Sequence, residues 1–145
     1  MGSTFKISSL NKDKLDKLLT PIVFCVNEEK VVNFAKGYCV LSINEILTLR
    51  LLGFEPEERN LMVADEFNNI IAENQEPLLI KDFEILFNPE YQFDVLKLFI
   101  MANRRNQVSV LWCGTYENDR LFFAEPGYID YKSYNLADYD ISCII

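Results

Sequence analysis

Two carboxylates, Asp82 and Glu84, follow the apolar segment of residues 78–80 and are the clearest candidates for chemistry in this chain. An acid at the end of a buried strand can hold a divalent cation and help to polarise water. Lys81 lies between the apolar segment and Asp82, and its ammonium group would compete with a metal ion for that carboxylate. We therefore interpret these acids as surface ion-pairing residues in preference to metal ligands.

A second place for chemistry is the loop after the apolar run of residues 21–26, which continues as Asn27-Glu-Glu-Lys30. A loop that cradles a phosphate needs glycines, because successive backbone N–H groups must converge on the anion without Cβ clashes. The glycines of this chain are Gly2, Gly37, Gly53, Gly114 and Gly127. None lies in this loop, so the part that would hold a nucleotide is missing.

The elements that would position these residues follow from periodicity and end signals. Apolar runs predict strands over residues 22–26, 38–43, 78–80, 107–113, 120–124 and 139–145. Helical patterns with caps and breakers predict helices over residues 12–19, 28–36, 44–52, 56–73 and 93–103, with Asn44 as a cap of the third. Residues 115–119 are expected to connect into a hairpin.

Alternating buried strands and helices predict an α/β fold with a mainly parallel, doubly wound sheet covered on both faces. The layout is that of a P-loop NTPase-like domain, with an antiparallel hairpin appended at the C-terminal end. The 145 residues are expected to form one domain, 1–145.

Ligands of open α/β sheets bind outside the carboxyl ends of the strands. We therefore expect residues 27–28, 43–44, 81–84 and 113–115 to converge. If a nucleotide such as ATP with Mg²⁺ binds, its contacts would be Asn27, Lys30, Asp82 and Thr115. Otherwise the sequence predicts no cofactor, no metal and no catalytic residue.

Composition excludes several classes of protein. The net charge of −8 disfavours direct binding to nucleic acid, and the absence of histidine excludes Ser-His-Asp triads and the common zinc sites. The four cysteines lie in or beside apolar segments and are predicted to be buried, reduced thiols. No apolar stretch reaches the roughly 20 residues of a membrane span, and Met1-Gly-Ser-Thr4 does not begin a signal peptide, so we predict a cytoplasmic protein without membrane contact.

Aromatic residues are concentrated after Gly114, where only Arg120 and Lys132 interleave with them. With so little positive charge, stacking on nucleic-acid bases is disfavoured, and the pattern favours core packing plus a patch that contacts another protein. The predicted contact residues are Tyr116, Tyr128, Tyr131 and Tyr134.

Several motifs in the second half of the chain resemble a known family. They are Phe83-Glu-Ile-Leu-Phe-Asn-Pro89, Asp94-Val-Leu-Lys-Leu98, Asn103-Arg-Arg-Asn106, Gly114-Thr-Tyr-Glu-Asn118 and Phe123-Ala-Glu-Pro-Gly127, followed by Tyr131 and Tyr134. Together they resemble BrxF, the small P-loop protein of type 3 BREX phage-defence systems. The resemblance implies an ATPase-like accessory protein that acts with larger protein partners in bacterial immunity.

The chain departs from that family in its first loop, which lacks the glycine-rich segment ending in Lys-Ser/Thr. The sequence therefore predicts a non-catalytic, P-loop-like interaction subunit of a phage-defence assembly. One alternative is a nucleotide-binding switch or ATPase with an atypical phosphate loop. Another is a phage or mobile-element protein that mimics a defence subunit, which genome neighbourhood would distinguish.

Overall fold

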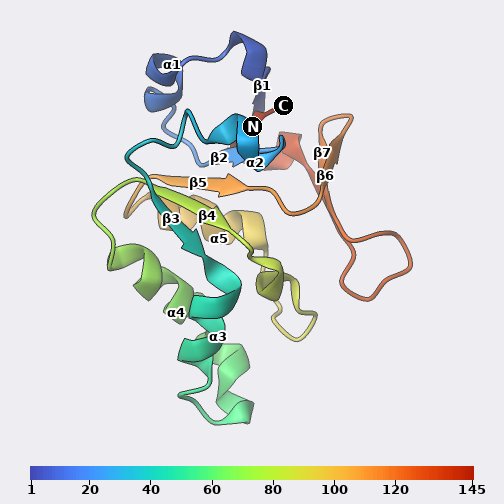
Figure 1. The fold of residues 1–145 in the computed structure, drawn as a ribbon. Helices are drawn as coiled ribbons and strands as arrows, with labels where there is room; N and C mark the ends of the chain where they lie inside the picture. The colour runs from blue at the N-terminus through green and yellow to red at the C-terminus, as the bar shows by residue number, and fades with distance from the viewer.

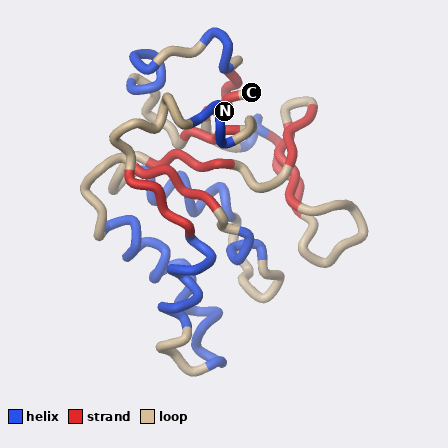
Figure 2. Tube along the Cα trace, viewed as in Figure 1, coloured by secondary structure: helices blue, strands red, loops and turns tan.

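A six-stranded, fully parallel sheet forms the centre of the computed structural model, which describes residues 1–145 (Figures 1 and 2). Its strands are β1 (Ser3–Phe5), β2 (Ile22–Phe24), β3 (Cys39–Ser42), β4 (Leu78–Lys81), β5 (Val108–Leu111) and β9 (Ser142–Ile144). They lie side by side in the order β1-β9-β2-β5-β4-β3. The predicted α/β class with a mainly parallel sheet is therefore confirmed.

Strand β2 lies inside the sheet, where Val23 is paired with Val110 of β5 on one side and with Cys143 of β9 on the other. The two ends of the chain meet at one edge, because β1 pairs in parallel with β9. The sequence did not predict β1, since Ser3-Thr-Phe5 is short and exposed and carries no apolar run.

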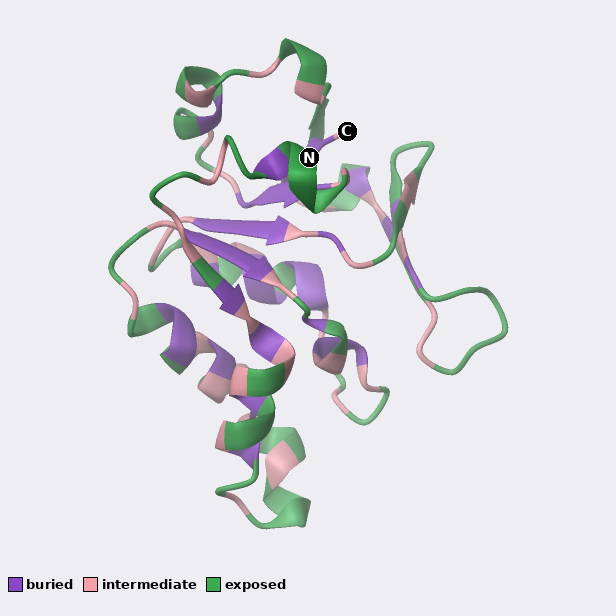
Figure 3. Ribbon diagram, in the orientation of Figure 1, coloured by how far each residue is buried: buried purple, intermediate pink, exposed green.

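The two faces of the sheet are covered unequally. On one face lies a core of 28 buried residues, built with helices α3 (Ile43–Leu51), α4 (Pro56–Ala72) and α5 (Val95–Asn103) and the 3-10 turn η2 (Glu84–Phe87). The other face holds a core of six, under the short helices α1 (Lys12–Asp16) and α2 (Glu28–Val31). Figure 3 shows the buried strands between these layers. Side chains alternate between faces, so Val23 joins the larger core while Ile22 and Phe24 join the smaller.

Helix ends follow local chemistry in most places. The side chain of Asn11 accepts a hydrogen bond from the Lys14 N–H at 2.9 Å and caps α1, and Pro56 occupies the first turn of α4. Asn44 was predicted to cap a helix, and this was wrong, because α3 already begins at Ile43 and the Asn44 amide is used elsewhere. None of the helices combines the length and apolar composition needed to cross a bilayer.

A separate antiparallel sheet is formed by β6 (Thr115–Glu117), β7 (Arg120–Phe123) and β8 (Lys132–Asn135), with the 3-10 turn η3 (Leu136–Asp138) after it. Asn118 and Asp119 both have positive φ, at 50° and 60°, as a two-residue hairpin turn with the right twist requires. The predicted C-terminal position of this appendage was wrong. It is an insertion, because the chain returns from it to add β9 to the parallel sheet.

Gly114 is the point at which the chain leaves β5 for the antiparallel sheet. A Cβ at this position would lie 1.8 Å from the Phe122 carbonyl oxygen, so the two backbones can approach only with glycine here. The same carbonyl accepts a hydrogen bond from Trp112 Nε1 at 3.0 Å. The rings of Phe87 and Phe123 stack with their centroids 3.9 Å apart. The two sheets therefore share one hydrophobic core.

Candidate functional site

Polar side chains at the ends of β3 and β4 and at the start of α2 meet at the carboxyl-end edge of the parallel sheet, as predicted. There, Lys81 Nζ lies 3.1 Å from Glu28 Oε1, and Ser42 Oγ donates to Asp82 Oδ2 at 2.7 Å. Parallel strands bring their carboxyl ends to one edge, which is why segments far apart in sequence converge here. The polar side chains at this edge therefore form hydrogen bonds and an ion pair with one another.

Asn44 completes this set of pairs. Its Nδ2 donates to Glu84 Oε2 at 2.5 Å, its Oδ1 accepts from the Ile85 N–H at 2.9 Å, and its own N–H donates to the carbonyl of Asp82 at 2.6 Å. One asparagine thus ties the start of α3 to the turn after β4. Asp82 itself has a φ of 49°, a left-handed conformation that aspartate tolerates better than most residues.

Lys81 was expected to compete with a metal ion for the Asp82 carboxylate, but it pairs with Glu28 and not with Asp82. Successive residues along a strand point to opposite faces of the sheet. Lys81 therefore reaches α2, on the face with the smaller core, while Asp82 turns toward Ser42 of β3. The expected surface ion pairing of Asp82 and Glu84 is wrong, because these acids accept hydrogen bonds from the neutral side chains of Ser42 and Asn44 and form no ion pair. No cluster of three or more cysteine and acid side chains has the geometry to hold a metal ion.

The four residues predicted to contact a nucleotide are not brought together by any side-chain hydrogen bond or ion pair. Asn27 precedes α2 without a side-chain cap, and the Lys30 side chain is exposed. Thr115 lies on the exposed face of β6 and lines a cavity of about 310 Å³ with Phe122 and Tyr131. None of the five cavities is lined by Asn27, Lys30 or Asp82.

The cysteines are free, as expected, but only Cys143 is fully buried and the other three are half-buried. Burial, followed by the nearby charge of Glu84, raises the pKa of the Cys113 thiol well above its ordinary range. A hydrogen bond to Cys25 and burial raise the pKa of Cys143 in the same direction. Both groups stay protonated at neutral pH, and a thiol is a poor nucleophile.

The predicted contact tyrosines separate into surface and core residues. Tyr128 is 65% exposed on the loop between β7 and β8, and Tyr116 and Tyr131 are half-buried. Tyr134 is only 6% exposed, with its ring edge-to-face against Trp112 at 6.2 Å, because β8 turns this position toward the shared core. Beside Tyr128, the sequence analysis missed Ile129, which is 87% exposed and which no periodic pattern marks.

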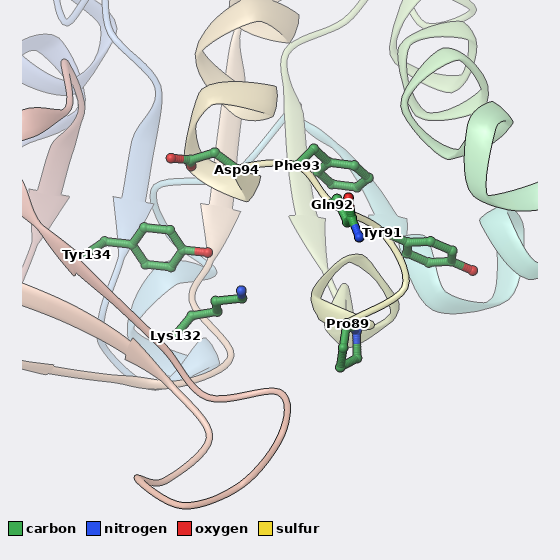
Figure 4. Close-up of a pocket in the computed structure, with 7 residues that line it drawn as sticks. All are labelled: Pro89, Tyr91, Gln92, Phe93, Asp94, Lys132 and Tyr134. Atoms are coloured by element: carbon green, nitrogen blue, oxygen red, sulfur yellow. The ribbon is translucent and has the colours of Figure 1, made fainter.

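The sequence analysis also missed a cleft of about 420 Å³ between β8 and the loop of residues 89–94 (Figure 4). Lys132 and Tyr134 line it from β8, and Asp94 lies where the loop enters α5. The Asp94 side chain caps that helix by accepting from the Lys97 N–H at 3.2 Å. The Asn88-Pro89 break marked a loop here, but only the folding of the inserted sheet brings β8 beside it.

A scan against models of protein families, a search of curated proteins and a search of solved structures each found no match to this chain.

Proposed function

We propose that this protein is a non-catalytic interaction subunit of a bacterial phage-defence assembly of the BREX type, built on a P-loop NTPase-like fold. The observation that carries the proposal is that the polar side chains at the carboxyl-end edge of the parallel sheet are already paired with one another. Lys81, Ser42 and Asn44, which could have contacted a ligand, are each engaged with a carboxylate of the same chain. A ligand would have to break these pairs before it gained contacts of its own.

The strand order supports the P-loop-like part of the proposal. Strand β2 precedes the loop that lacks glycine, Asp82 directly follows β4, and β5 lies between these two strands. An apolar strand that ends in an acid is the element with which P-loop enzymes hold Mg²⁺. A related chain that lost its glycine-rich loop would keep this order, because the hydrophobic core and not the loop stabilises the sheet.

The role as an interaction subunit is supported by the antiparallel sheet. Two of the motifs that resemble BrxF, residues 114–118 and 123–127, build β6, the glycine junction before it and the loop after β7. That loop exposes Tyr128 and Ile129. Exposed aromatic and aliphatic side chains on a loop held by a folded sheet are typical of contacts with protein partners.

Thermal melting in ATP, ADP or GTP with Mg²⁺ tests the absence of a nucleotide function. A ligand that binds only the folded state raises its stability by mass action, so we expect no saturable shift up to a few millimolar. Turnover of ATP that Asp82→Ala abolishes would overturn the non-catalytic assignment. A saturable shift without turnover would favour the nucleotide-binding switch.

The partner role is tested by pairwise co-purification with tagged subunits of a BREX-type system. We expect Tyr128→Ala combined with Ile129→Ala to weaken retention at least about tenfold, as removal of central apolar contacts does. Leu61→Ala is the matched control, since Leu61 is 78% exposed on α4, away from this loop. Equal retention of both variants, with unchanged melting temperatures, would contradict the proposed surface.

A further inference from the structure

Tyr134 carries a hydroxyl group whose proton has no acceptor within the chain. The residue is only 6% exposed. Its ring packs edge-to-face against the rings of Trp112 and Tyr139, at centroid distances of 6.2 and 5.7 Å. Its O–H donates to no acceptor of the protein, and Figure 4 shows it directed into the cleft. The hydroxyl oxygen accepts a hydrogen bond from the Val95 N–H, and the hydroxyl proton is left for an acceptor that a ligand in the cleft would supply.

The ionisation state of Tyr134 suits it to donate. Burial, followed by the charges of Asp94 and Tyr139, raises the pKa of its hydroxyl above the ordinary value of tyrosine. The group therefore remains an O–H at neutral pH.

Lys132 supplies a second donor to the same space. It lies two residues before Tyr134 on β8, and alternate residues of a strand share one face. Its ammonium group points into the cleft near the Tyr134 hydroxyl and forms no ion pair with any carboxylate of the chain (Figure 4). The side chain of Gln92 lines the opposite wall.

Asp94 is the one acid in the lining, and both of its oxygens are already engaged. Oδ1 accepts from the Lys97 N–H at 3.2 Å, and Oδ2 accepts from the Tyr139 hydroxyl at 2.5 Å. Its carboxylate is turned away from Lys132 (Figure 4). Asp94 therefore leaves the Lys132 ammonium and the Tyr134 hydroxyl free to donate. Its negative charge disfavours a ligand that brings more than one negative charge.

We propose that this cleft binds a carboxylate group, whose two oxygens accept hydrogen bonds from the Lys132 ammonium and the Tyr134 hydroxyl. One charged and one neutral donor match the single charge and two acceptor oxygens of a carboxylate. The group could belong to a small carboxylic acid or to an acidic side chain of a polypeptide. The site stands independently of the proposed role in phage defence, because it rests on the cleft alone.

The fluorescence of Trp112 reports on the cleft, since it is the only tryptophan and lies against Tyr134. The full chain is titrated at constant ionic strength with propionate, with N-acetylglutamate α-amide and with inorganic phosphate, against chloride. We expect a saturable change with both carboxylates. Tighter binding of the blocked glutamate identifies a polypeptide side chain as the source, and equal or tighter binding of propionate identifies a small acid.

Two variants test the donors separately. Lys132→Met removes the charge and keeps the apolar stem, and we expect it to weaken carboxylate binding at least about tenfold. Tyr134→Phe keeps the ring in place, and we expect a loss of about threefold or more. Lys36→Gln, an exposed lysine remote from the cleft, should bind as the wild type does.

The proposal is overturned if the wild type shows no saturable change, if Lys132→Met binds like Lys36→Gln, or if phosphate binds as tightly as the carboxylates. Melting temperatures of the variants are measured alongside, and Tyr134→Phe remains a valid test because its ring packing is retained.

Discussion

The carboxyl-end edge of the parallel sheet and the cleft beside β8 both hold polar side chains, but these differ in how they are partnered. At the edge, Asp82 accepts from Ser42 and Lys81 pairs with Glu28. In the cleft, neither the Lys132 ammonium nor the Tyr134 hydroxyl donates to an acceptor of the chain. Position in the fold would have favoured the edge as the binding site, whereas unpartnered donors favour the cleft.

The difference teaches that a position at the carboxyl-end edge of a sheet does not by itself make polar side chains available to a ligand. Polar groups at the edge of a sheet can satisfy one another once no ligand competes for them, and they then stabilise the turns that carry them. The inserted sheet forms one wall of a cleft, and the two donors on that wall, Lys132 and the Tyr134 hydroxyl, have no acceptor in the chain.

The largest expected effect comes from Phe83→Ala, which should destabilise both the carboxyl-end edge and the cleft. Phe83 lies between Asp82 and Glu84 in sequence, and its ring is 5.9 Å from that of Trp112, which supports the cleft. Removing a fully buried phenylalanine costs about 3–5 kcal/mol of unfolding free energy. Urea unfolding measures the loss, and a cost below about 1 kcal/mol would show that the two regions do not share this support.

Asp82→Ala tests whether the edge acts as a structural unit. We expect it to lower the free energy of unfolding by about 1–2 kcal/mol, chiefly because alanine is disfavoured at the left-handed φ of this residue. The exposed hydrogen bond from Ser42 adds a smaller amount. Carboxylate binding in the cleft should be unchanged.

Asp82→Gly is the matched control, because glycine adopts the same φ without the steric cost and loses only the hydrogen bond. It should therefore be more stable than Asp82→Ala. The reverse order, measured by the same urea unfolding, would show that the side-chain contact and not the backbone conformation dominates at this position.

The smallest effect is a pH dependence that belongs to the cleft. Because the folded state raises the pKa of Tyr134, the unfolded chain loses this proton first, and the stabilisation is present below about pH 10 and is lost above it. At pH 11 the wild type should have lost about 1 kcal/mol more than Tyr134→Phe, relative to pH 8. Urea unfolding at both pH values measures this difference, and parallel losses in the two proteins would contradict it.

The apolar pattern was sufficient to predict most of the parallel sheet and its helices. Strands β2 to β5 and helices α3 to α5 fall within two residues of the expected bounds at every end, because buried strands and amphipathic helices carry strong periodicities. Strands β6 and β8 were not separately predicted, since they are short and half exposed. The convergence of residues 28, 42–44 and 81–84 was also predictable, because parallel strands end at one edge.

By itself, the sequence determined the class of fold, the absence of a glycine loop after β2 and the negative charge of the molecule. These follow from local pattern and composition. Tertiary structure alone decided that the final segment returns to the parallel sheet as β9, that Lys81 pairs with Glu28 and that Tyr134 lines a cleft with Lys132. Each of these depends on which segments meet across long stretches of chain, and the packing of the shared core sets that, not any signal within one segment.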